Sequence, residues 1–520
     1  MEQLRRYPLG VQYFPEIREE GRVYVDKTDH VYRITHLDSK YIFLSRPRRF
    51  GKSLLTSTLR YYFEGRRDLF IGLAIERLEK DWTAYPVLHF DMSGGKNLSR
   101  ESLIKYILDI LKDNERRLGI DPEGGEEPNI RMKNLISNAY KKTGKQVVVL
   151  IDEYDAPLLD VMHEEKSLKA IRDTVQTFYK PLKAAGEYLR FVFLTGITKF
   201  SQLSIFSALN NIMNISMDKE FADICGITAE EMLTQLSPDI DLMAESLGKS
   251  REETIKALRR NYDGYHFTWP SPDIYNPYSL LTAFAKKEIG SYWFGSGTPT
   301  YLIEMLRKYK VVPQQIGGRS CKASSFDAPT EVMTDITPLL YQSGYITIKG
   351  YSAFKDRYTL DIPNREVRIG LMESLIPSYV RHQDDVKNLA GDMAEMIYYG
   401  DMDGALQLAQ KVLKAVPYCD NANTEGHYQS LLYLLFTLMG QYVDVEVRTA
   451  TGRIDMVMCT PDRLYIMELK LRDDAETALE QIDLKQYPDR FALCNLPVVK
   501  VGISFDVNSR TIRDWKIQQE

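Results

Sequence analysis

The chain has 520 residues, of which 44% are hydrophobic and 11% aromatic, and its formal net charge is −5. This length predicts two to four domains with buried cores, and the charge excludes a generally basic protein that coats nucleic acid. The 5 cysteines form no C-x-x-C pair and no apolar run is long enough to span a membrane, so we expect a soluble cytoplasmic protein with reduced thiols.

The first informative segment combines a strand, a loop and a helix, predicted at residues 41–45, 46–53 and 54–63. This order is the context of a phosphate-binding P-loop, and the loop ends in FGKS. We expect Gly51 to let the backbone approach a phosphate and Lys52 to contact the β and γ phosphates. The Ser53 hydroxyl is then a ligand of Mg²⁺ at a helix N-terminus, whose dipole favours anions.

One position departs from the motif G-x-x-x-x-G-K-[ST], because Arg46 stands where the first glycine is expected. Together with Arg48 and Arg49 it makes the loop basic. Three roles are open for these arginines: contact with phosphate, action across a subunit boundary, or simple solvation, in that order of preference. Arg46 and Arg49 are therefore candidate nucleotide ligands.

A second run, KQVVVLIDEYD at residues 145–155, places five apolar residues directly before two carboxylates. Such a run predicts a buried parallel strand, whose carboxyl end is where α/β sheets bind ligands. Asp152 is the candidate Mg²⁺ ligand, and Glu153 is the group expected to polarise the attacking water. A further strand at 190–195 ends in Thr195, whose hydroxyl could sense the γ-phosphate. The alternative is an α/β core whose acidic strand ends only cap helices.

The middle of the chain predicts mostly helices, in a helical domain at 217–329 and a connector at 330–418. Thr228 and Glu231 form a capping box at the start of one helix. In the connector, a helix predicted from Thr330 precedes β-like runs at 345–351 and 356–363. This order resembles a winged helix, for which DNA binding and a purely packing role are equally favoured.

The C-terminal region contains a predicted hairpin, in which Pro461 and Asp462 form the turn. With the turn centred between these two residues, Asp455 falls directly opposite Glu468, and the alternation of side chains puts Lys470 on the same face.

Two carboxylates and the backbone carbonyl of Leu469 offer the hard oxygen ligands that Mg²⁺ prefers. Lys470 is near enough to orient a bound water or to stabilise the charge that develops in phosphodiester hydrolysis. The alternative is an exposed hairpin with ordinary surface charges.

The pattern D-x(12)-E-x-K resembles the core of the PD-(D/E)XK nuclease superfamily. The resemblance implies a restriction-endonuclease-like α/β domain at 419–520, a further acidic metal ligand at Glu425, and a catalytic Gln481 in the helix after the E-x-K strand. One property opposes it. Residues 420–520 contain 11 Lys or Arg and 16 Asp or Glu, whereas phosphate backbones select basic surfaces.

Several segments resemble the AAA-ATPase-like family of bacterial proteins that carry a PD-(D/E)XK domain at the C-terminus. They include YVDKT (24–28), LSRPRRFGKSLL (44–55), LIDEYDAP (150–157), FLTGITKFS (193–201), LNNI (209–212) and YDGYHF (262–267). The resemblance implies an α/β protein whose ATPase domain, at 1–216, has a parallel sheet with helices on both faces.

The sequence as a whole predicts an ATP- and Mg²⁺-dependent protein in which the ATPase domain controls a nuclease acting on nucleic acid, with DNA favoured. The competing interpretation is an ATP-driven signalling or binding module whose nuclease-like fold recognises a partner without cleavage. The intact D…ExK pattern favours the enzyme, and the acidic C-terminal region favours the module. No membrane partner is expected, and the oligomeric state is left open.

Overall fold

The computed structural model describes residues 5–95, 98–162, 164–199, 212–294, 300–330, 333–415, 425–440, 444–450, 453–471, 473–484 and 496–519. The chain forms two compact units, the first made of residues 1–309 and 318–364 and the second of 310–317 and 365–520. The predicted connector at 330–418 is thus divided between the two units. The finer division into four domains stays a prediction, and its last boundary, near 417–423, lies outside the described residues.

A five-stranded parallel sheet forms the centre of the first unit, in the order β2-β3-β4-β1-β5. Its strands are β1 (Tyr41–Ser45), β2 (Val87–Asp91), β3 (Val147–Asp152), β4 (Leu189–Gly196) and β5 (Met213–Asn214). β1 and β3 are buried along their whole length, as strands that are apolar on both faces must be. Because all pairs are parallel, the carboxyl ends of β1 and β3 lie at one edge, with β4 between them.

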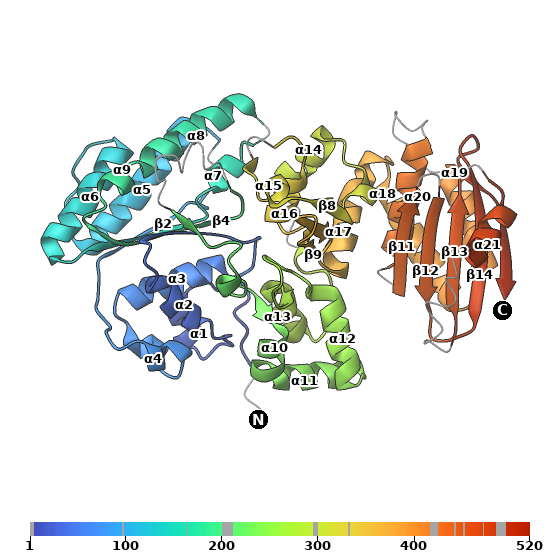
Figure 1. The fold of residues 1–520 in the computed structure, drawn as a ribbon, viewed down its shortest axis with the longest axis horizontal. Helices are drawn as coiled ribbons and strands as arrows, with labels where there is room; N and C mark the ends of the chain where they lie inside the picture. Colours follow the sequence, from blue (N-terminus) through green and yellow to red (C-terminus); the bar gives the residue numbers. More distant parts are fainter. Residues whose placement is uncertain are drawn as a thin grey trace. The chain divides into compact units, whose positions relative to one another are not determined.

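Helices cover both faces of this sheet, as predicted, with α3 on one side and α5, α6, α8 and α9 on the other (Figure 1). The connection from β1 to β2 crosses the sheet in one direction and those from β2 to β4 return, so right-handed crossovers require opposite faces. The helices are α1 (Phe14–Glu19), α2 (Thr28–Thr35), α3 (Lys52–Phe63), η1 (Arg67–Phe70), α4 (Ala74–Leu78), α5 (Arg100–Leu118), α6 (Pro128–Thr143), α7 (Ala156–Leu159), α8 (Glu165–Tyr179) and α9 (Pro181–Ala184).

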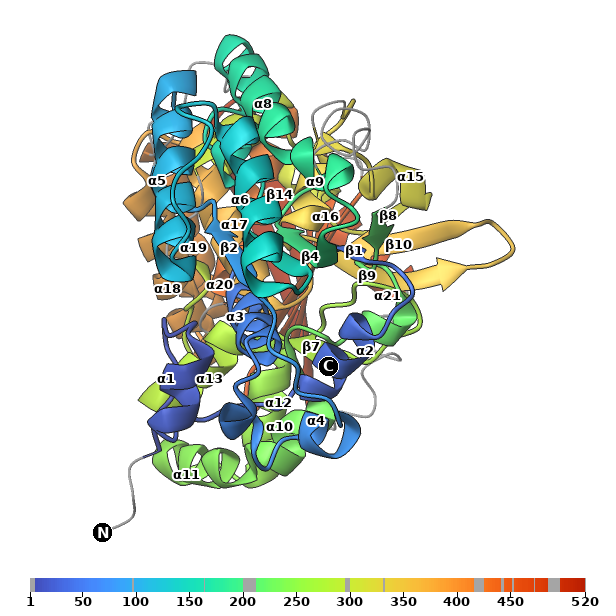
Figure 2. The same ribbon diagram turned by 90° about the vertical axis from the view of Figure 1, so that its left-hand side faces the viewer.

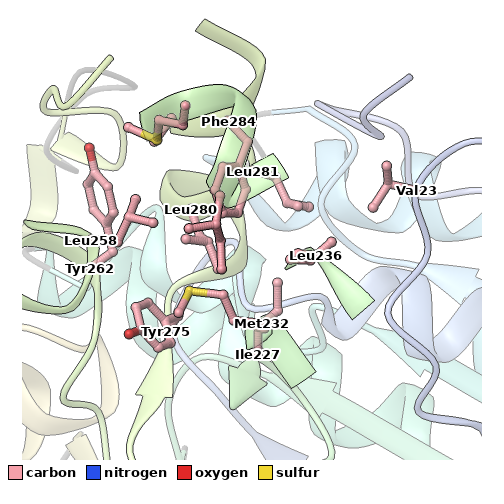
Figure 3. Close-up of a cluster of buried hydrophobic side chains, with 13 residues drawn as sticks. Val23, Ile227, Met232, Leu236, Leu258, Tyr262, Tyr275, Leu280, Leu281 and Phe284 are labelled. Atoms are coloured by element: carbon pink, nitrogen blue, oxygen red, sulfur yellow. The ribbon is translucent and has the colours of Figure 1, made fainter. Parts of the chain in front are cut away.

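A helical part follows the sheet in the chain. It contains η2 (Lys219–Phe221), β6 (Ile227–Thr228), α10 (Ala229–Gln235), α11 (Ser237–Leu247), α12 (Arg251–Tyr262), β7 (Ile274–Tyr275) and α13 (Pro277–Lys286). The helices meet in one apolar cluster, in which Met232, Leu258 and Leu280 are fully buried (Figure 3). α10 starts at the predicted capping box, where the Thr228 hydroxyl accepts from the backbone N–H of Glu231.

The last part of the first unit has the order helix, strand, two helices and hairpin of a winged helix; α16 and the hairpin lie in the predicted connector, and the elements before them lie in the predicted helical domain. Its elements are α14 (Thr300–Lys308), β8 (Arg319–Cys321), α15 (Ala323–Phe326), α16 (Thr337–Gln342), β9 (Thr347–Ser352) and β10 (Arg357–Asp361). The strands form an antiparallel sheet in the order β8-β10-β9. The helix predicted from Thr330 was wrong in its start: α16 begins at Thr337, whose backbone N–H donates to the Asp335 carboxylate at 2.6 Å.

The second unit contains a mixed sheet in the order β11-β12-β13-β14-β15, antiparallel except between β13 and β14. Its strands are β11 (Asp444–Ala450), β12 (Arg453–Cys459), β13 (Leu464–Lys470), β14 (Val498–Asp506) and β15 (Thr511–Gln519). Its helices are η4 (Pro313–Gln315), α17 (Arg365–Leu375), η6 (Ile376–Ser378), α18 (Gln383–Tyr398), α19 (Met402–Ala415), α20 (Glu425–Met439) and α21 (Ala475–Leu484).

The helix α21 packs on one face of this sheet. Gly502 of β14 is opposite Glu468 of β13, and a Cβ at Gly502 would collide with the carbonyl of Ala475 and the side chain of Leu479 in α21. Since paired residues point to the same face, Glu468 lies on the face that α21 covers. α20 packs on the other face, where the rings of Tyr428 and Phe505 lie 5.7 Å apart.

Candidate active sites

The loop between β1 and α3 has the backbone that a P-loop needs. Gly51 is the N-cap of α3 and has a φ of 95°, a conformation that glycine adopts at no steric cost. α3 begins at Lys52, two residues earlier than predicted, so the free N–H groups of the first helical turn belong to the FGKS motif itself. This end of a 12-residue helix is therefore suited to an anion.

Lys52 is held inside the loop rather than in solvent. Its side chain is 2% exposed, and its ammonium lies 3.1 Å from the Glu153 carboxylate and donates to the carbonyl of Pro47 at 3.2 Å. Glu153 itself has a φ of 49°, so the extended backbone of β3 ends before it, at Asp152. The two residues predicted to contact the γ-phosphate and to polarise water are therefore paired with each other.

Asp152 ends β3 as a buried carboxylate, 3% exposed. Burial and the neighbouring negative charge of Glu153 raise the pKa of Asp152, and a hydrogen bond from Ser53 and the charge of Lys52 oppose this shift. A buried carboxylate beside the P-loop serine supplies the oxygen ligands and the negative charge that a hard cation prefers. The structure thus brings Ser53 and Asp152 together, as the sequence predicted.

Asp91 is a carboxylate of this edge that the sequence analysis did not single out. It ends β2 directly opposite Asp152, and its charge contributes to the raised pKa of Asp152. The signal was present, because Asp91 follows an apolar strand just as Asp152 does. Asp155 has a different role: it is fully buried and accepts from the backbone N–H groups of Ile197 and Thr198 at 3.1 and 2.6 Å, which fastens the end of β4 to β3.

A cavity of about 790 Å³ opens above the loop, and Gly51, Lys52, Ser53 and Glu153 line it. Its size is in the range of small-molecule and cofactor sites. Part of the remaining wall comes from segments that the sequence did not connect to the site: residues 8–12, Tyr278, Trp293, Phe294 and Tyr345. The Trp293 indole N–H donates to the backbone carbonyl of Arg48 at 3.2 Å, so this wall is attached to the loop.

Arg46 is not placed to bind phosphate, and that prediction is corrected. Its side chain is buried, with 1% of the residue exposed, and does not line the cavity. The guanidinium donates to the carbonyls of Ser45, Ser216 and Phe221 at 2.8 to 2.9 Å and lies 4.2 Å from the centre of the Phe267 ring. Arg46 therefore holds the loop to distant backbone, and burial lowers its pKa to about 10.

The other two residues predicted to contact the nucleotide, Arg49 and Thr195, differ in whether they line the cavity. Arg49 lines the cavity with a φ of 65°, and its guanidinium stacks 3.9 Å above the Tyr278 ring. Thr195 is fully buried and does not line the cavity, whereas Ile197, two residues later, does. The expected contact between Thr195 and the γ-phosphate is therefore not supported by its position.

In the second unit, the register of β12 and β13 is the one predicted, with Asp455 directly opposite Glu468. Glu468 is fully buried, and its carboxylate lies 3.3 Å from the ammonium of Lys470, which is 7% exposed. Lys470 also donates to the amide oxygen of Gln481 on α21 at 2.7 Å. The E-x-K strand and the following helix thus bring Glu468, Lys470 and Gln481 into one hydrogen-bonded group.

The remaining metal-site predictions are less directly placed. Glu425 begins α20, on the opposite face of the sheet, and its side chain and that of Asp455 are outside the described part. Leu469 stands between Glu468 and Lys470 in the sequence of β13, its side chain is buried, and the role of its carbonyl stays a prediction. Among the side chains that the structure describes, no group of three or more His, Cys, Asp or Glu is arranged to hold a metal ion.

The fold and the cavity define a P-loop nucleotide-binding protein, joined to a mixed-sheet domain with a D…ExK strand pair. Residues 8–206 match the family described as predicted AAA-ATPase, and residues 423–515 match the PD-(D/E)XK nuclease superfamily. The chain is 34% identical to the "Uncharacterized protein in vnfD 5'region" of Azotobacter chroococcum mcd 1, over 99% of both chains. It belongs to the AAA-ATPase-like family whose members carry a C-terminal PD-(D/E)XK nuclease domain.

Among solved structures, the chain is similar to the ORC2 protein of Aeropyrum pernix, in a structure titled with its ADPNP and ADP complexes. The identity is 12% and the TM-score 0.27, over 67% of this chain and 94% of that one. A similarity of this degree supports no argument about function. In the described ranges, no helix is long and apolar enough to cross a membrane.

Proposed function

We propose that the chain is an ATP-controlled, Mg²⁺-dependent nuclease that cuts DNA. The observation that carries the proposal is the group in the second unit: Asp455 opposite Glu468, with Lys470 on the same face and held by Gln481. A hairpin with ordinary surface charges would expose these residues, whereas Glu468 is fully buried. Burying a carboxylate and an ammonium side by side costs desolvation free energy. Buried ionisable groups of this kind are found preferentially at functional sites.

The residues of the first unit fit ATP with Mg²⁺. Lys52 and the first turn of α3 are suited to the phosphates, and Ser53 and Asp152 are suited to the cation. When bound, Mg²⁺ neutralises phosphate charge. Glu153 then has the position of a residue that accepts a proton from an attacking water, once Lys52 exchanges its carboxylate for phosphate.

In the second unit, the carboxylates of Asp455 and Glu468 are suited to a hard cation. A bound Mg²⁺ would supply a water of lowered pKa and a Lewis acid for the phosphodiester. The chain's own contribution is Lys470, whose ammonium is directed by Gln481 and Glu468 towards the same face. From that position it can stabilise the negative charge that develops on the phosphate.

Control of cleavage by ATP follows from the presence of both sites in one chain. ATP regulates the nuclease only if it binds the restrained and the active states with different affinity, and such couplings are typically about 5- to 150-fold. The test is cleavage of linear, circular and single-stranded DNA by the full chain, with and without ATP and with Mg²⁺ or Mn²⁺. Lys470→Ala should abolish cleavage and leave ATP turnover intact, and Lys52→Ala should change the cleavage rate within that range.

The control variant is Lys516→Ala, which removes an exposed lysine from β15 of the same unit. It should cleave like the wild type. Equal cleavage rates for the wild type and Lys52→Ala, at every ATP concentration, would show that ATP does not control cleavage and that the chain carries two independent activities. No cleavage of any nucleic acid by the wild type would contradict the nuclease proposal itself.

A second candidate function rests on one observation, the acidity of the C-terminal region, with 11 Lys or Arg and 16 Asp or Glu in residues 420–520. In this alternative the chain is an ATP-driven signalling or binding module, and its nuclease-like fold recognises a partner without cleavage. The two proposals differ in the effect expected of Lys470→Ala. A nuclease loses DNA cleavage in this variant, whereas a binding module has no need of the Lys470 ammonium and keeps its function.

A further inference from the structure

The hairpin of β9 and β10 carries the most exposed large hydrophobic side chain in the described part of the chain, Phe354, at 98%. Residues 351–357 are all exposed, and Figure 2 shows the yellow hairpin extending away from β8 and α15. An aromatic ring held fully in water contributes nothing to the core. Single exposed apolar residues are common on protein surfaces; Phe354 differs because a hairpin with basic neighbours presents it.

The tip of the hairpin has a defined shape. The backbone N–H of Asp356 donates to the carbonyl of Ala353 at 3.4 Å, and Asp356 has a φ of 47°. This is a turn closed by a residue in the left-handed region, as in common short hairpins. Phe354 and Lys355 occupy its two central positions, where side chains point outward from both strands.

The hairpin is also stiff, because aromatic contacts run from its root towards its tip. Tyr351 and Tyr358 are direct partners across the strands, with ring centres 4.6 Å apart. The Tyr358 ring lies 5.3 Å from that of Phe326, a fully buried residue of α15. The Tyr351 hydroxyl donates to the Asp356 carboxylate at 3.1 Å. Phe354 is therefore presented on a rigid support rather than on a loose loop.

The charge of this small sheet is opposite to that of the chain. Strands β8, β9 and β10 with the residues next to them, 319–322 and 347–361, contain 5 Lys or Arg and 2 Asp, whereas the whole chain has a net charge of −5. Lys322, directly after β8, and Arg357, on the neighbouring strand β10, are exposed, and Lys355 is next to Phe354. One of the two acids, Asp356, already accepts a hydrogen bond from Tyr351.

We infer that this hairpin binds duplex DNA, with Phe354 inserted between base pairs and Lys355, Arg357 and Lys322 on the flanking phosphates. Apolar wedges beside basic residues are the means by which proteins enter and open a base step, and phosphate contacts supply the salt-dependent affinity. The inference deepens the proposed function, because it places the nucleic-acid contact that the acidic C-terminal region does not supply.

A protein partner is the less suitable occupant. A specific protein interface buries about 800 Å² on each side, around a desolvated core. The hairpin offers one fully exposed aromatic ring and a partly exposed tyrosine among charged side chains. The excess of positive charge and the single exposed ring of Phe354 instead fit a nucleic acid, which offers phosphates and stacked bases.

The test measures duplex DNA binding by the full chain in EDTA, so that cleavage is blocked in every variant. Phe354→Ala should weaken binding about 10-fold, since an aromatic contact with a base has an effect of roughly this size, and should leave the dependence of Kd on salt unchanged. Lys355→Ala should instead reduce the slope of log Kd against log salt by about one phosphate contact.

A direct readout uses a duplex that contains 2-aminopurine, whose fluorescence rises when a neighbouring base unstacks. The wild type should raise the fluorescence, Phe354→Ala should not, and Phe354→Trp should restore it. The matched controls are Tyr399→Ala, which removes another exposed aromatic ring, and Lys112→Ala, which removes an exposed lysine of α5. Both should bind like the wild type.

Equal Kd and equal fluorescence for the wild type and Phe354→Ala would overturn the inference, even if the chain cleaves DNA normally. Binding to anionic vesicles but not to DNA, lost in Phe354→Ala, would also overturn it in favour of a membrane contact. Loss of DNA binding in Phe354→Ala supports the inference even if no cleavage is ever observed, so its result is separable from that of the nuclease proposal.

Discussion

The ammonium of Lys52 lies 3.1 Å from the carboxylate of Glu153, inside the loop that would receive the phosphates of ATP. Sequence reasoning gave these residues separate tasks, and the structure makes them partners. ATP must therefore displace Glu153 from Lys52 when it binds. The same displacement would release Glu153 to act on water, so that the base becomes available only when nucleotide is present.

The first prediction concerns this pair. Glu153→Gln should bind ATP more tightly than the wild type, because a neutral amide competes less for the buried Lys52 ammonium than a carboxylate does. It should also lose ATP turnover. Lys52→Ala should abolish binding. Equilibrium titration with ATP and Mg²⁺ measures both effects.

The control for this comparison is Glu165→Gln, which changes an exposed carboxylate at the start of α8 and should leave affinity and turnover unchanged. Weaker binding by Glu153→Gln than by the wild type would show that the carboxylate supports ATP rather than competing with it.

The second prediction separates Arg46 from Arg49. Arg46→Met should lower the free energy of unfolding of the first unit by about 2–4 kcal/mol, because several buried carbonyls lose their donor. Arg49 lines the cavity, so Arg49→Met should lower ATP affinity and change stability little. Urea unfolding and ATP titration of both variants test this, with Arg116→Met, an exposed arginine of α5 that does not line the cavity, as the matched control. A larger loss of ATP affinity in Arg46→Met than in Arg49→Met would contradict the assignment.

The strands and their register were predictable because the signals are local. An apolar run such as 147–151 specifies a buried strand by itself, and the turn at Pro461 and Asp462 fixes the pairing of Asp455 with Glu468. The capping box of Thr228 is equally local. The family resemblance supplied the domain order, and the matches to residues 8–206 and 423–515 confirm it.

The partners of individual side chains were not predictable, because they come from distant parts of the chain. Arg46 is bonded to carbonyls 170 to 176 residues away, and nothing in the loop sequence distinguishes that from a phosphate contact. Tyr278, in α13 of the helical part, and Trp293, in the segment after it, both reach the cavity. The start of α16 was missed since the hydrogen bond that the backbone N–H of Thr337 donates to the Asp335 carboxylate competes with helix continuation upstream.

The third prediction treats Gln481 as a positioning residue. Gln481→Ala should lower the rate of DNA cleavage about 10-fold at saturating DNA with little change in Kd for DNA, since Lys470 loses the acceptor that directs its ammonium. Gln481→Glu, which keeps an acceptor oxygen at the same position, should recover part of the rate. Single-turnover cleavage separates the two quantities. Equal rates in Gln481→Ala and Gln481→Glu would show that the hydrogen bond has no part in orienting Lys470.

The last prediction concerns pH and His89, a half-buried residue in β2. Burial and the nearby charges of Arg60 and Arg117 lower the pKa of His89 to about 4, from an ordinary value of 6.5. The unfolded chain then binds a proton at this residue at a higher pH than the folded chain does, so stability present above pH 6.5 is lost as the pH falls towards 4.

Between pH 7 and pH 5 this linkage should cost the wild type about 1–2 kcal/mol of the free energy of unfolding of the first unit. His89→Asn cannot take up the proton and should lose correspondingly less over the same interval. Urea unfolding of both proteins at the two pH values measures the difference, and the exposed His382→Asn, on the second unit, serves as the control. An equal loss of stability in the wild type and in His89→Asn would show that His89 takes up its proton without unfolding, and would assign the acid sensitivity to other groups.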